Sequence, residues 1–147
     1  MLGLAVLQSD SIIDYSVKLF KEIWSPAKMD HILASLTSAI DDYNITDMVL
    51  SIPPIHFQEE PFQELWMAIA SLGHTKCINV AMYRQAELQA FCGKEERMTR
   101  RSLMEAIIHW YPELEGFYKR EVRNKNKYYH KMFEAIATAT LFLHQGE

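Results

Sequence analysis

The segment Tyr128-Tyr129-His130-Lys131-Met132-Phe133-Glu134-Ala135-Ile136-Ala137-Thr138-Ala139-Thr140-Leu141 predicts a helix in the C-terminal part of the sequence. Its apolar residues recur at three- and four-residue steps, as they do along the buried face of an amphipathic helix. Glu134 lies beside that face, one helical turn after His130. An isolated acid in this position is either a surface residue at the border of the buried face or the remnant of an active site.

The composition indicates one globular domain over residues 1–147. Of the 147 residues, 49% are hydrophobic and 23% are charged, as in ordinary soluble proteins. No apolar run reaches the roughly 20 residues that cross a bilayer, and the N-terminus lacks the basic region of a signal peptide. We therefore expect a cytoplasmic protein without a membrane partner. Cys77 and Cys92 suggest neither a disulfide framework nor a metal site, and we expect both to be small core residues.

Hydrophobic periodicity and turn residues divide the chain into short strands and helices. In order, these are strands at 2–7 and 12–20, a possible strand at 21–24, a helix at 26–42, a strand at 45–52, a helix at 61–72, a strand at 77–82, and helices at 85–91, 99–110 and 128–141. Ser25 should cap the first helix and Asn44 should end it. Gly73 should cap the second helix at its C-terminal end.

This order predicts an α/β fold built on a mixed five-stranded sheet. The first strands should form an antiparallel hairpin, and the later helix–strand units should add parallel strands. Helices should then cover both faces of the sheet, because successive crossovers pack against it.

Basic residues are concentrated in one part of this acidic chain. Residues 94–131 carry 10 basic and 6 acidic side chains, whereas residues 1–93 carry 5 basic and 11 acidic ones. The basic residues form two clusters: Lys94, Arg97, Arg100 and Arg101, and then Lys119, Arg120, Arg123, Lys125, Lys127 and Lys131. Three tyrosines lie among or beside the second cluster: Tyr118, Tyr128 and Tyr129.

Two interpretations of these clusters stay open. Lysine and arginine in a groove neutralise phosphates, and neighbouring aromatic rings can stack on unpaired bases, so the clusters can be a nucleic-acid surface. They can equally be a solvated helix face and a polar loop, with Glu95, Glu96 and Glu121 as local ion partners.

Motifs of several enzyme classes are missing from the sequence. The glycines are isolated, and neither a His-Glu-x-x-His zinc motif nor a Gly-x-Ser-x-Gly nucleophile elbow occurs. His130 and Glu134 remain, one turn apart and projecting in the same direction. Such a pair can hold a divalent metal or pass a proton, although a hydrogen-bonded surface pair is the commoner outcome. A single carboxylate also falls short of a two-metal site.

Several segments resemble those of a known family, in the same order. Met1-Leu2-Gly3-Leu4-Ala5 resembles an opening strand usually written Ile-Leu-Gly-Ile-Asp, and Val80–Ala90 is similar to the last strand and the segment after it. Gly93–Leu103 resembles the helix start that follows, and Phe133–Ala139 resembles a terminal Ala-Asp-Ala-Leu-Ala-Ile-Ala helix. The family is the RuvC-type Holliday-junction resolvase branch of the ribonuclease H-like superfamily.

This resemblance implies a magnesium-dependent nuclease, typically dimeric, with several acidic or histidine ligands. The aspartate of the opening strand falls at Ala5, and the carboxylate after the middle strand falls near Ser51. The terminal helix keeps Glu134, with His130 or Lys131 at the second ligand position. Because one carboxylate of the usual set remains, we expect an impaired or inactive site without a metal or other cofactor.

The sequence therefore favours a RuvC-like domain that has lost its nuclease site and binds branched or duplex DNA through its basic surface. One alternative is an active magnesium-dependent, structure-selective endonuclease built on Glu134, His130 and another acid. The other is a protein-interaction subunit with no nucleic-acid role. A homodimer with Phe62 and Trp66 at its seam is a further expectation, although core packing explains these two residues equally well.

Overall fold

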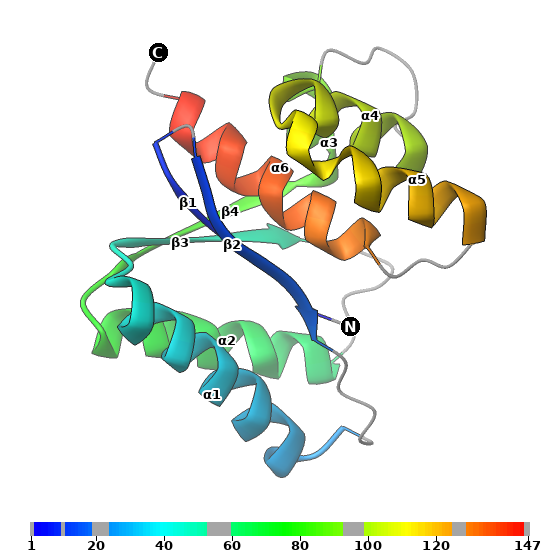
Figure 1. Cartoon of the computed structure of the whole chain (residues 1–147). Helices are drawn as coiled ribbons and strands as arrows, with labels where there is room; N and C mark the ends of the chain where they lie inside the picture. Colours follow the sequence, from blue (N-terminus) through cyan, green and yellow to red (C-terminus); the bar gives the residue numbers. More distant parts are fainter. Residues whose placement is uncertain are drawn as a thin grey trace. The chain divides into compact units, whose positions relative to one another are not determined.

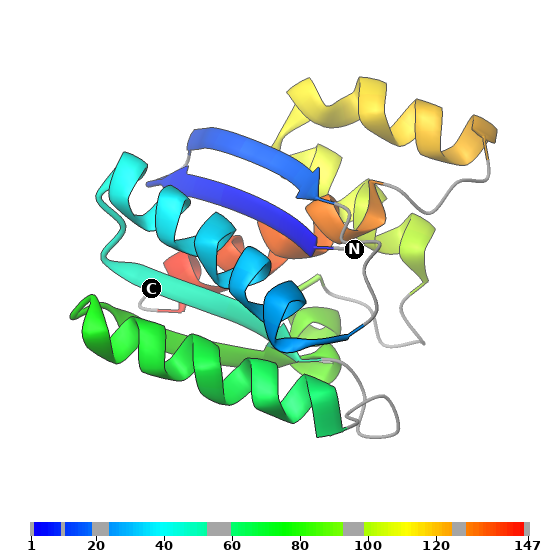
Figure 2. The ribbon, with the colours of Figure 1, turned by 90° about the horizontal axis from the view of Figure 1, so that it is seen from below.

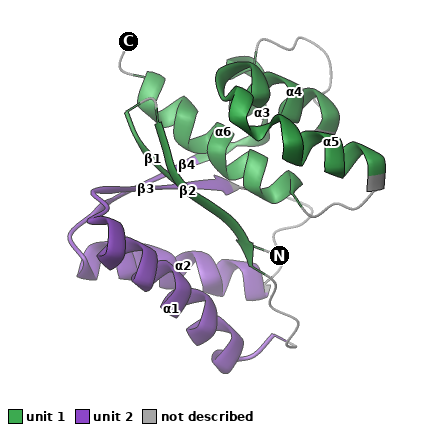
Figure 3. Ribbon diagram, viewed as in Figure 1, with its two compact units in different colours: residues 1–19, 83–147 green, residues 20–82 purple. Residues whose placement is uncertain are grey.

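The computed structural model describes residues 2–9, 11–18, 24–52, 60–92, 99–124 and 129–145. Two compact units are present (Figure 3), which we call unit 1 (residues 1–19 and 83–147) and unit 2 (residues 20–82). Unit 1 is therefore built from two separate segments of the chain, and the whole of unit 2 is inserted between them. Strand β4 (Asn79–Arg84) carries the chain from unit 2 back into unit 1.

Unit 1 begins with the predicted antiparallel hairpin, made of β1 (Leu2–Gln8) and β2 (Ser11–Lys18). The register pairs Leu2 with Lys18, and an irregularity between Val6 and Leu7 leaves one extra residue in β2. Ser9 adopts a positive φ of 55° in the turn. The hairpin is thus confirmed, with bounds close to those that the alternation of apolar residues predicts.

Helix α6 (His130–His144) lies along β1 and forms the centre of unit 1 (Figures 1 and 2). Strand and helix approach so closely at Gly3 that a Cβ there would overlap the backbone carbonyl of Lys131. The predicted apolar face is buried, and it includes the fully enclosed side chains of Phe133 and Ile136. The close contact explains why a glycine stands in the first strand.

Four shorter elements complete unit 1: α3 (Gln85–Phe91), α4 (Arg100–Trp110), the 3-10 helix η2 (Pro112–Leu114) and α5 (Glu115–Asn124). Thr99 caps α4 by accepting a hydrogen bond from the backbone of Ser102, so the helix begins one residue after the predicted start at residue 99. Helices α3 and α4 both pack on α6, and α4 also contacts α5. Helix α5 lies between the predicted helices at 99–110 and 128–141, where no helix was predicted from the sequence.

Unit 2 contains α1 (Pro26–Tyr43), β3 (Asp47–Ile52), α2 (Glu60–Thr75) and the first part of β4. Both caps predicted for α1 are confirmed: Ser25 accepts from the backbone of Lys28, and Asn44 takes a left-handed conformation. Helices α1 and α2 pack together. Phe62 and Trp66 meet edge to face with centroids 5.0 Å apart, so each ring has a packing partner within unit 2. The homodimer stays a prediction.

Two expectations for unit 2 are wrong. Gly73 does not cap α2, because the helix continues to Thr75. Instead a Cβ at Gly73 would overlap the side chain of Val80, so this glycine permits close packing of the helix on β4. Cys77 is exposed in a turn with a φ of 56°, outside the strand and the core in which we expected it. Cys92, at the end of α3, is half-buried.

The α/β class is confirmed, but the single five-stranded sheet is not. Among the described residues, β1 pairs with β2 and β3 pairs with β4, as two separate two-stranded sheets. Most of the possible strand at residues 21–24 lies outside the described residues, and Trp24 itself lies in a bend. Within the described part of the chain, no helix is long and apolar enough to cross a membrane.

Candidate functional site

Glu134 lies in the second turn of α6 and is 7% exposed. Its Oε2 atom is 3.4 Å from His130 Nε2 and 3.6 Å from Lys131 Nζ. Its Oε1 atom accepts a hydrogen bond of 3.5 Å from Gln85 Nε2. The structure therefore brings together His130 and Glu134, as predicted, and adds two nitrogen donors to the same carboxylate.

Helical geometry and packing produce this arrangement. Residues three and four positions apart share a helix face, which places Lys131 and His130 beside Glu134. Gln85 comes from the first turn of α3, directly after β4, and α3 packs on α6. The backbone carbonyl of Glu134 also accepts a hydrogen bond of 2.7 Å from Thr138 Oγ1. The cluster thus joins α3 to the beginning of α6.

His130 is mostly buried, with 18% of its side chain exposed. A proton on Nε2 suits the contact with Glu134 and leaves Nδ1 as an acceptor. This Nδ1 atom is buried and has no hydrogen-bond partner among the described residues. Glu134 therefore orients His130 through Nε2, and the pair is largely buried, unlike the exposed surface pair that is common for this spacing.

Ala5 is the first-strand residue at which the family resemblance would place an aspartate. Its methyl group lies on the face of β1 toward α6. Ala5 pairs with Tyr15 and lies two residues after Gly3, so it shares the face of β1 that lies against α6. Asp14 pairs with Val6 and therefore belongs to the opposite face. Ser51, at the other expected ligand position, lies in β3 of unit 2.

The residues around Glu134 do not fit a magnesium ion. Magnesium prefers six oxygen ligands in octahedral geometry. The contacts found at the Glu134 carboxylate come from nitrogen atoms, and one of these is the ammonium of Lys131. In the described part of the chain, no group of three or more His, Cys, Asp or Glu residues is placed to hold a metal ion. We derive no metal-dependent step from this site.

The predicted basic clusters are only partly described. Four of their members lie outside the described residues: Lys94, Arg97, Lys125 and Lys127. Arg100 begins α4, but its side chain is likewise outside the description. The remaining members are Arg101 on α4, Lys119, Arg120 and Arg123 on α5, and Lys131 on α6.

Arg101 is tied into a cluster between α4 and α5. Its Nε atom lies 3.3 Å from Glu105 and donates to the Tyr118 hydroxyl at 3.2 Å. That hydroxyl donates in turn to Glu105 at 2.8 Å. The Tyr118 hydroxyl, and then the charge of Glu105, raise the pKa of the Arg101 guanidinium above its usual value. Arg101 is therefore partly neutralised by its own helix.

Three of the remaining described cations lie on α5: Lys119, Arg120 and Arg123. Together with Gly116 they form what we call the α5 stripe. These residues follow the i, i+3, i+4, i+7 spacing of one helix face, and all four are exposed. Lys119 lies 3.5 Å from the exposed Glu115. Arg123 makes no ion pair with any described residue. In Figures 1 and 2, α5 lies at the periphery of unit 1, which fits the exposure of this face.

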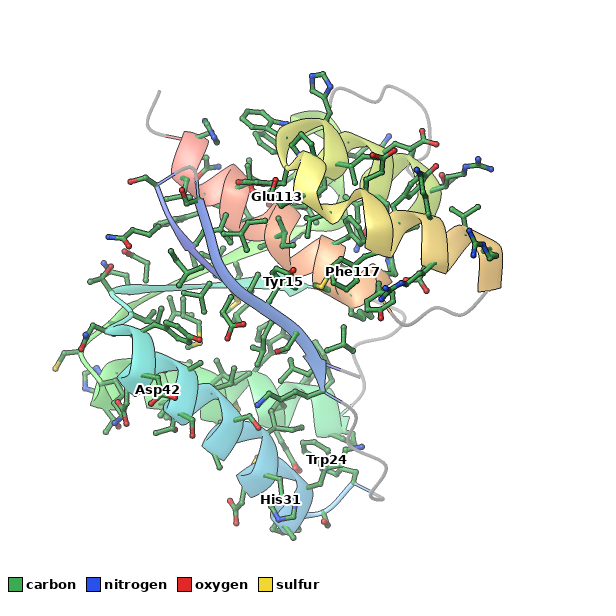
Figure 4. All side chains as sticks on the ribbon, viewed as in Figure 1. Tyr15, Trp24, His31, Asp42, Glu113 and Phe117 are labelled. Carbon is green, nitrogen blue, oxygen red and sulfur yellow. The ribbon has the colours of Figure 1, made fainter. Side chains whose placement is uncertain are left out.

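Aromatic residues beside the α5 stripe pack against one another. Phe117 contacts Tyr15 at 5.4 Å and Tyr129 at 4.9 Å between ring centroids, both edge to face. Figure 4 shows Tyr15 of β2 and Phe117 of α5 side by side within unit 1. The Arg120 guanidinium lies 5.8 Å from the centre of the Phe117 ring. These rings join α5 and the start of α6 to the hairpin.

Two sets of contacts in these clusters could not be predicted from the sequence. Gln85 is 49 positions from Glu134 in the chain, and no local pattern indicates their contact. The row of Tyr15, Phe117 and Tyr129 likewise joins residues of β2 and α5 to the residue that precedes α6. The α5 stripe could have been predicted from its i, i+3, i+4, i+7 spacing, because that prediction needs only a helix over residues 115–124.

Comparison with known proteins adds no family. No family model, curated protein or solved structure matches the chain.

Proposed function

We propose that this chain is a non-catalytic DNA-binding protein that contacts the phosphate backbone through the α5 stripe. The observation that carries the proposal is the placement of Lys119, Arg120 and Arg123 on one exposed helix face, within about 6 Å along the helix axis. Cations gathered on one face release counterions from DNA, and this supplies affinity without any metal.

Gly116 supports the same use of the face. A Cβ at this position would meet nothing within 4 Å, and the exposed site carries no side chain of its own. A phosphate group can therefore approach the helix backbone next to Lys119 and Arg120. Contacts of this kind fix the position of a protein on DNA but do not read its sequence.

The tyrosines do not support base stacking. The Tyr118 hydroxyl is held by Glu105 and Arg101, and Tyr129 packs on Phe117. Tyr128 lies outside the described residues. Because these rings serve packing in unit 1, the proposal is for binding of duplex or branched DNA through its backbone, without a requirement for unpaired bases.

A RuvC-like, ribonuclease H-like ancestry is part of the proposal. It is supported by the antiparallel hairpin at the start, by the alternation of helices and strands, and by a terminal helix that packs on β1 and carries Glu134. The methyl group of Ala5 on the face toward α6, and the nitrogen donors at Glu134, support an impaired nuclease.

DNA affinity as a function of salt tests the proposal. We expect the anisotropy of a fluorescent duplex, and of a four-way junction with arms of equal sequence, to report binding that weakens as salt rises. Three phosphate contacts predict a slope of about −2.7 for log K against log salt concentration. Arg123→Glu should weaken binding to both probes and make the slope shallower by about 1.

Lys28→Glu is the matched control. It changes the formal charge by the same amount but lies in the first turn of α1 in unit 2. A Glu three positions after the Ser25 cap also suits a capping box, so this variant should fold. Equal losses in the two variants, or binding that does not depend on salt, would refute the α5 stripe as the DNA contact.

The same samples address the two alternatives. Cleavage of the four-way junction with magnesium or manganese, abolished by Glu134→Ala, would establish the nuclease alternative. The interaction subunit would show neither cleavage nor binding. The pairing of Arg101 with Glu105 and of Lys119 with Glu115 is the observation that favours a merely solvated surface.

A further inference from the structure

We infer that Lys131 serves as a built-in counter-charge for Glu134 where the resemblance would place a divalent metal ion, with His130 contacting the same carboxylate oxygen, so that this carboxylate clamps α3 to α6. Binding of DNA by α5 is not needed for this role.

The Glu134 carboxylate is surrounded by nitrogen donors on the described residues. Oε2 faces two nitrogen atoms, at 3.4 Å on His130 and 3.6 Å on Lys131, and Oε1 accepts from Gln85 at 3.5 Å. Both oxygens are thus engaged by nitrogen donors. A carboxylate as buried as Glu134 needs such partners, since an unpaired buried charge is strongly destabilising.

Chemistry disfavours a metal ion at the same place. A divalent cation would have to displace the ammonium of Lys131, which repels it, and would meet few oxygen ligands. The face of β1 that lies against α6 offers Gly3 and Ala5, which carry no oxygen in their side chains. The tethered ammonium has no translational freedom to lose on pairing, so it has an advantage over a free ion.

The position of the cluster gives the carboxylate its structural role. Gln85 begins α3 immediately after β4, where the chain re-enters unit 1. Lys131 and Met132, in the first turn of α6, lie against Gly3 of β1. Glu134 therefore links the point of re-entry to the helix turn that contacts the first strand.

Substitution of the ammonium tests the clamp. Lys131→Met keeps the length of the side chain and removes its charge, and we expect the melting temperature of the full chain to fall by about 3 °C. Lys119→Met is the matched control, because Lys119 pairs with the exposed Glu115. Its melting temperature should change by less than about 1 °C.

A double-mutant cycle separates the pair from general packing. Glu134→Gln should also lower the melting temperature, and adding Lys131→Met to it should cause little further loss, since the ammonium then has no carboxylate to pair with. Fully additive losses would overturn the clamp.

Metal binding is tested directly on the unaltered protein. Manganese at about 1 mM should not selectively broaden the imidazole proton signals of His130 in NMR spectra, and magnesium at about 10 mM should leave the melting temperature unchanged; these concentrations lie well above the dissociation constants of dedicated oxygen-ligand sites. Selective broadening at His130, or stabilisation by magnesium that Glu134→Gln abolishes, would overturn the inference and restore a metal site.

Discussion

The two units of this chain differ in both charge and core. Unit 1 carries 12 basic and 11 acidic side chains, a net charge of +1, whereas unit 2 carries 3 basic and 8 acidic ones, a net charge of −5. Unit 1 also encloses several large core residues completely, for example Phe133 and Leu114 at 0% exposure. The most buried side chains described in unit 2 are 5% to 7% exposed.

This difference in charge bears on which unit can approach a phosphate backbone. A net charge of −5 repels phosphate, so the proposed DNA contact is placed on unit 1 and not on unit 2. The deeper core of unit 1 also provides the firmer support for the α5 stripe and the Glu134 cluster. The formal charge of −4 for the whole chain hides this asymmetry.

The largest expected effect compares the two cores with one kind of substitution. Ile136 in unit 1 is fully buried and Ile69 in unit 2 is 5% exposed. We expect Ile136→Ala to lower the free energy of unfolding by about 4 kcal/mol and Ile69→Ala by about 2 kcal/mol, because the less enclosed site can relax around the cavity. Urea titrations followed by circular dichroism measure both. Equal losses would remove the contrast between the cores.

The next effect compares two glycines at close contacts. Gly3→Ala in unit 1 should cost about 3 kcal/mol, because the new methyl group would overlap the Lys131 carbonyl in the backbone of α6. In Gly73→Ala of unit 2 the overlap is with a side-chain methyl of Val80 and not with backbone, and alanine gains about 1 kcal/mol of helix propensity there. Its net cost should therefore be below about 1 kcal/mol. A Gly3→Ala protein with unchanged stability would contradict the close strand–helix contact.

A smaller effect concerns pH. Burial, and then the negative charge of Glu87, raise the pKa of Tyr83 above its usual value of 10.0. The folded state thus holds this proton more tightly than the unfolded state, so the stabilisation is fully present below pH 10.0 and is lost as pH rises through the higher folded pKa. Tyr83→Phe should weaken the loss of stability above pH 10.0, measured as urea midpoints across that range. Tyr43→Phe, at an exposed tyrosine of unit 2, is the control.

The smallest effect probes the α5 stripe. Gly116→Ala adds a methyl group that meets no other atom within 4 Å and favours the helix, so it should stabilise unit 1 by roughly 0.5 to 1 kcal/mol. DNA affinity should change by less than a factor of about 3, since all three cations remain. Weaker binding by more than that would show that the backbone at Gly116 is itself in contact with phosphate.

Local signals predicted local structure well. Ser25 and Asn44 lie at the two ends of α1 as expected, because each residue acts through hydrogen bonds within a few residues. Gly73 shows the limit of such signals. The same residue type suits a helix end or a close contact, and only the position of Val80 decides between them. The neighbours of Glu134 show the same limit. Helical spacing predicts the contact with His130, whereas no local pattern predicts the contact with Gln85.

The division of unit 1 into two chain segments has a consequence for how it folds. Strand β1 ends at residue 8, whereas α6, on which it packs, begins at residue 130. At typical rates of synthesis the hairpin is made on the order of ten seconds before its helix, and an isolated two-stranded hairpin is at best marginally stable. Contacts of such large sequence separation also slow folding. The hairpin therefore depends on a helix that is synthesised late. Until then its apolar face stays uncovered and is a candidate for chaperone binding.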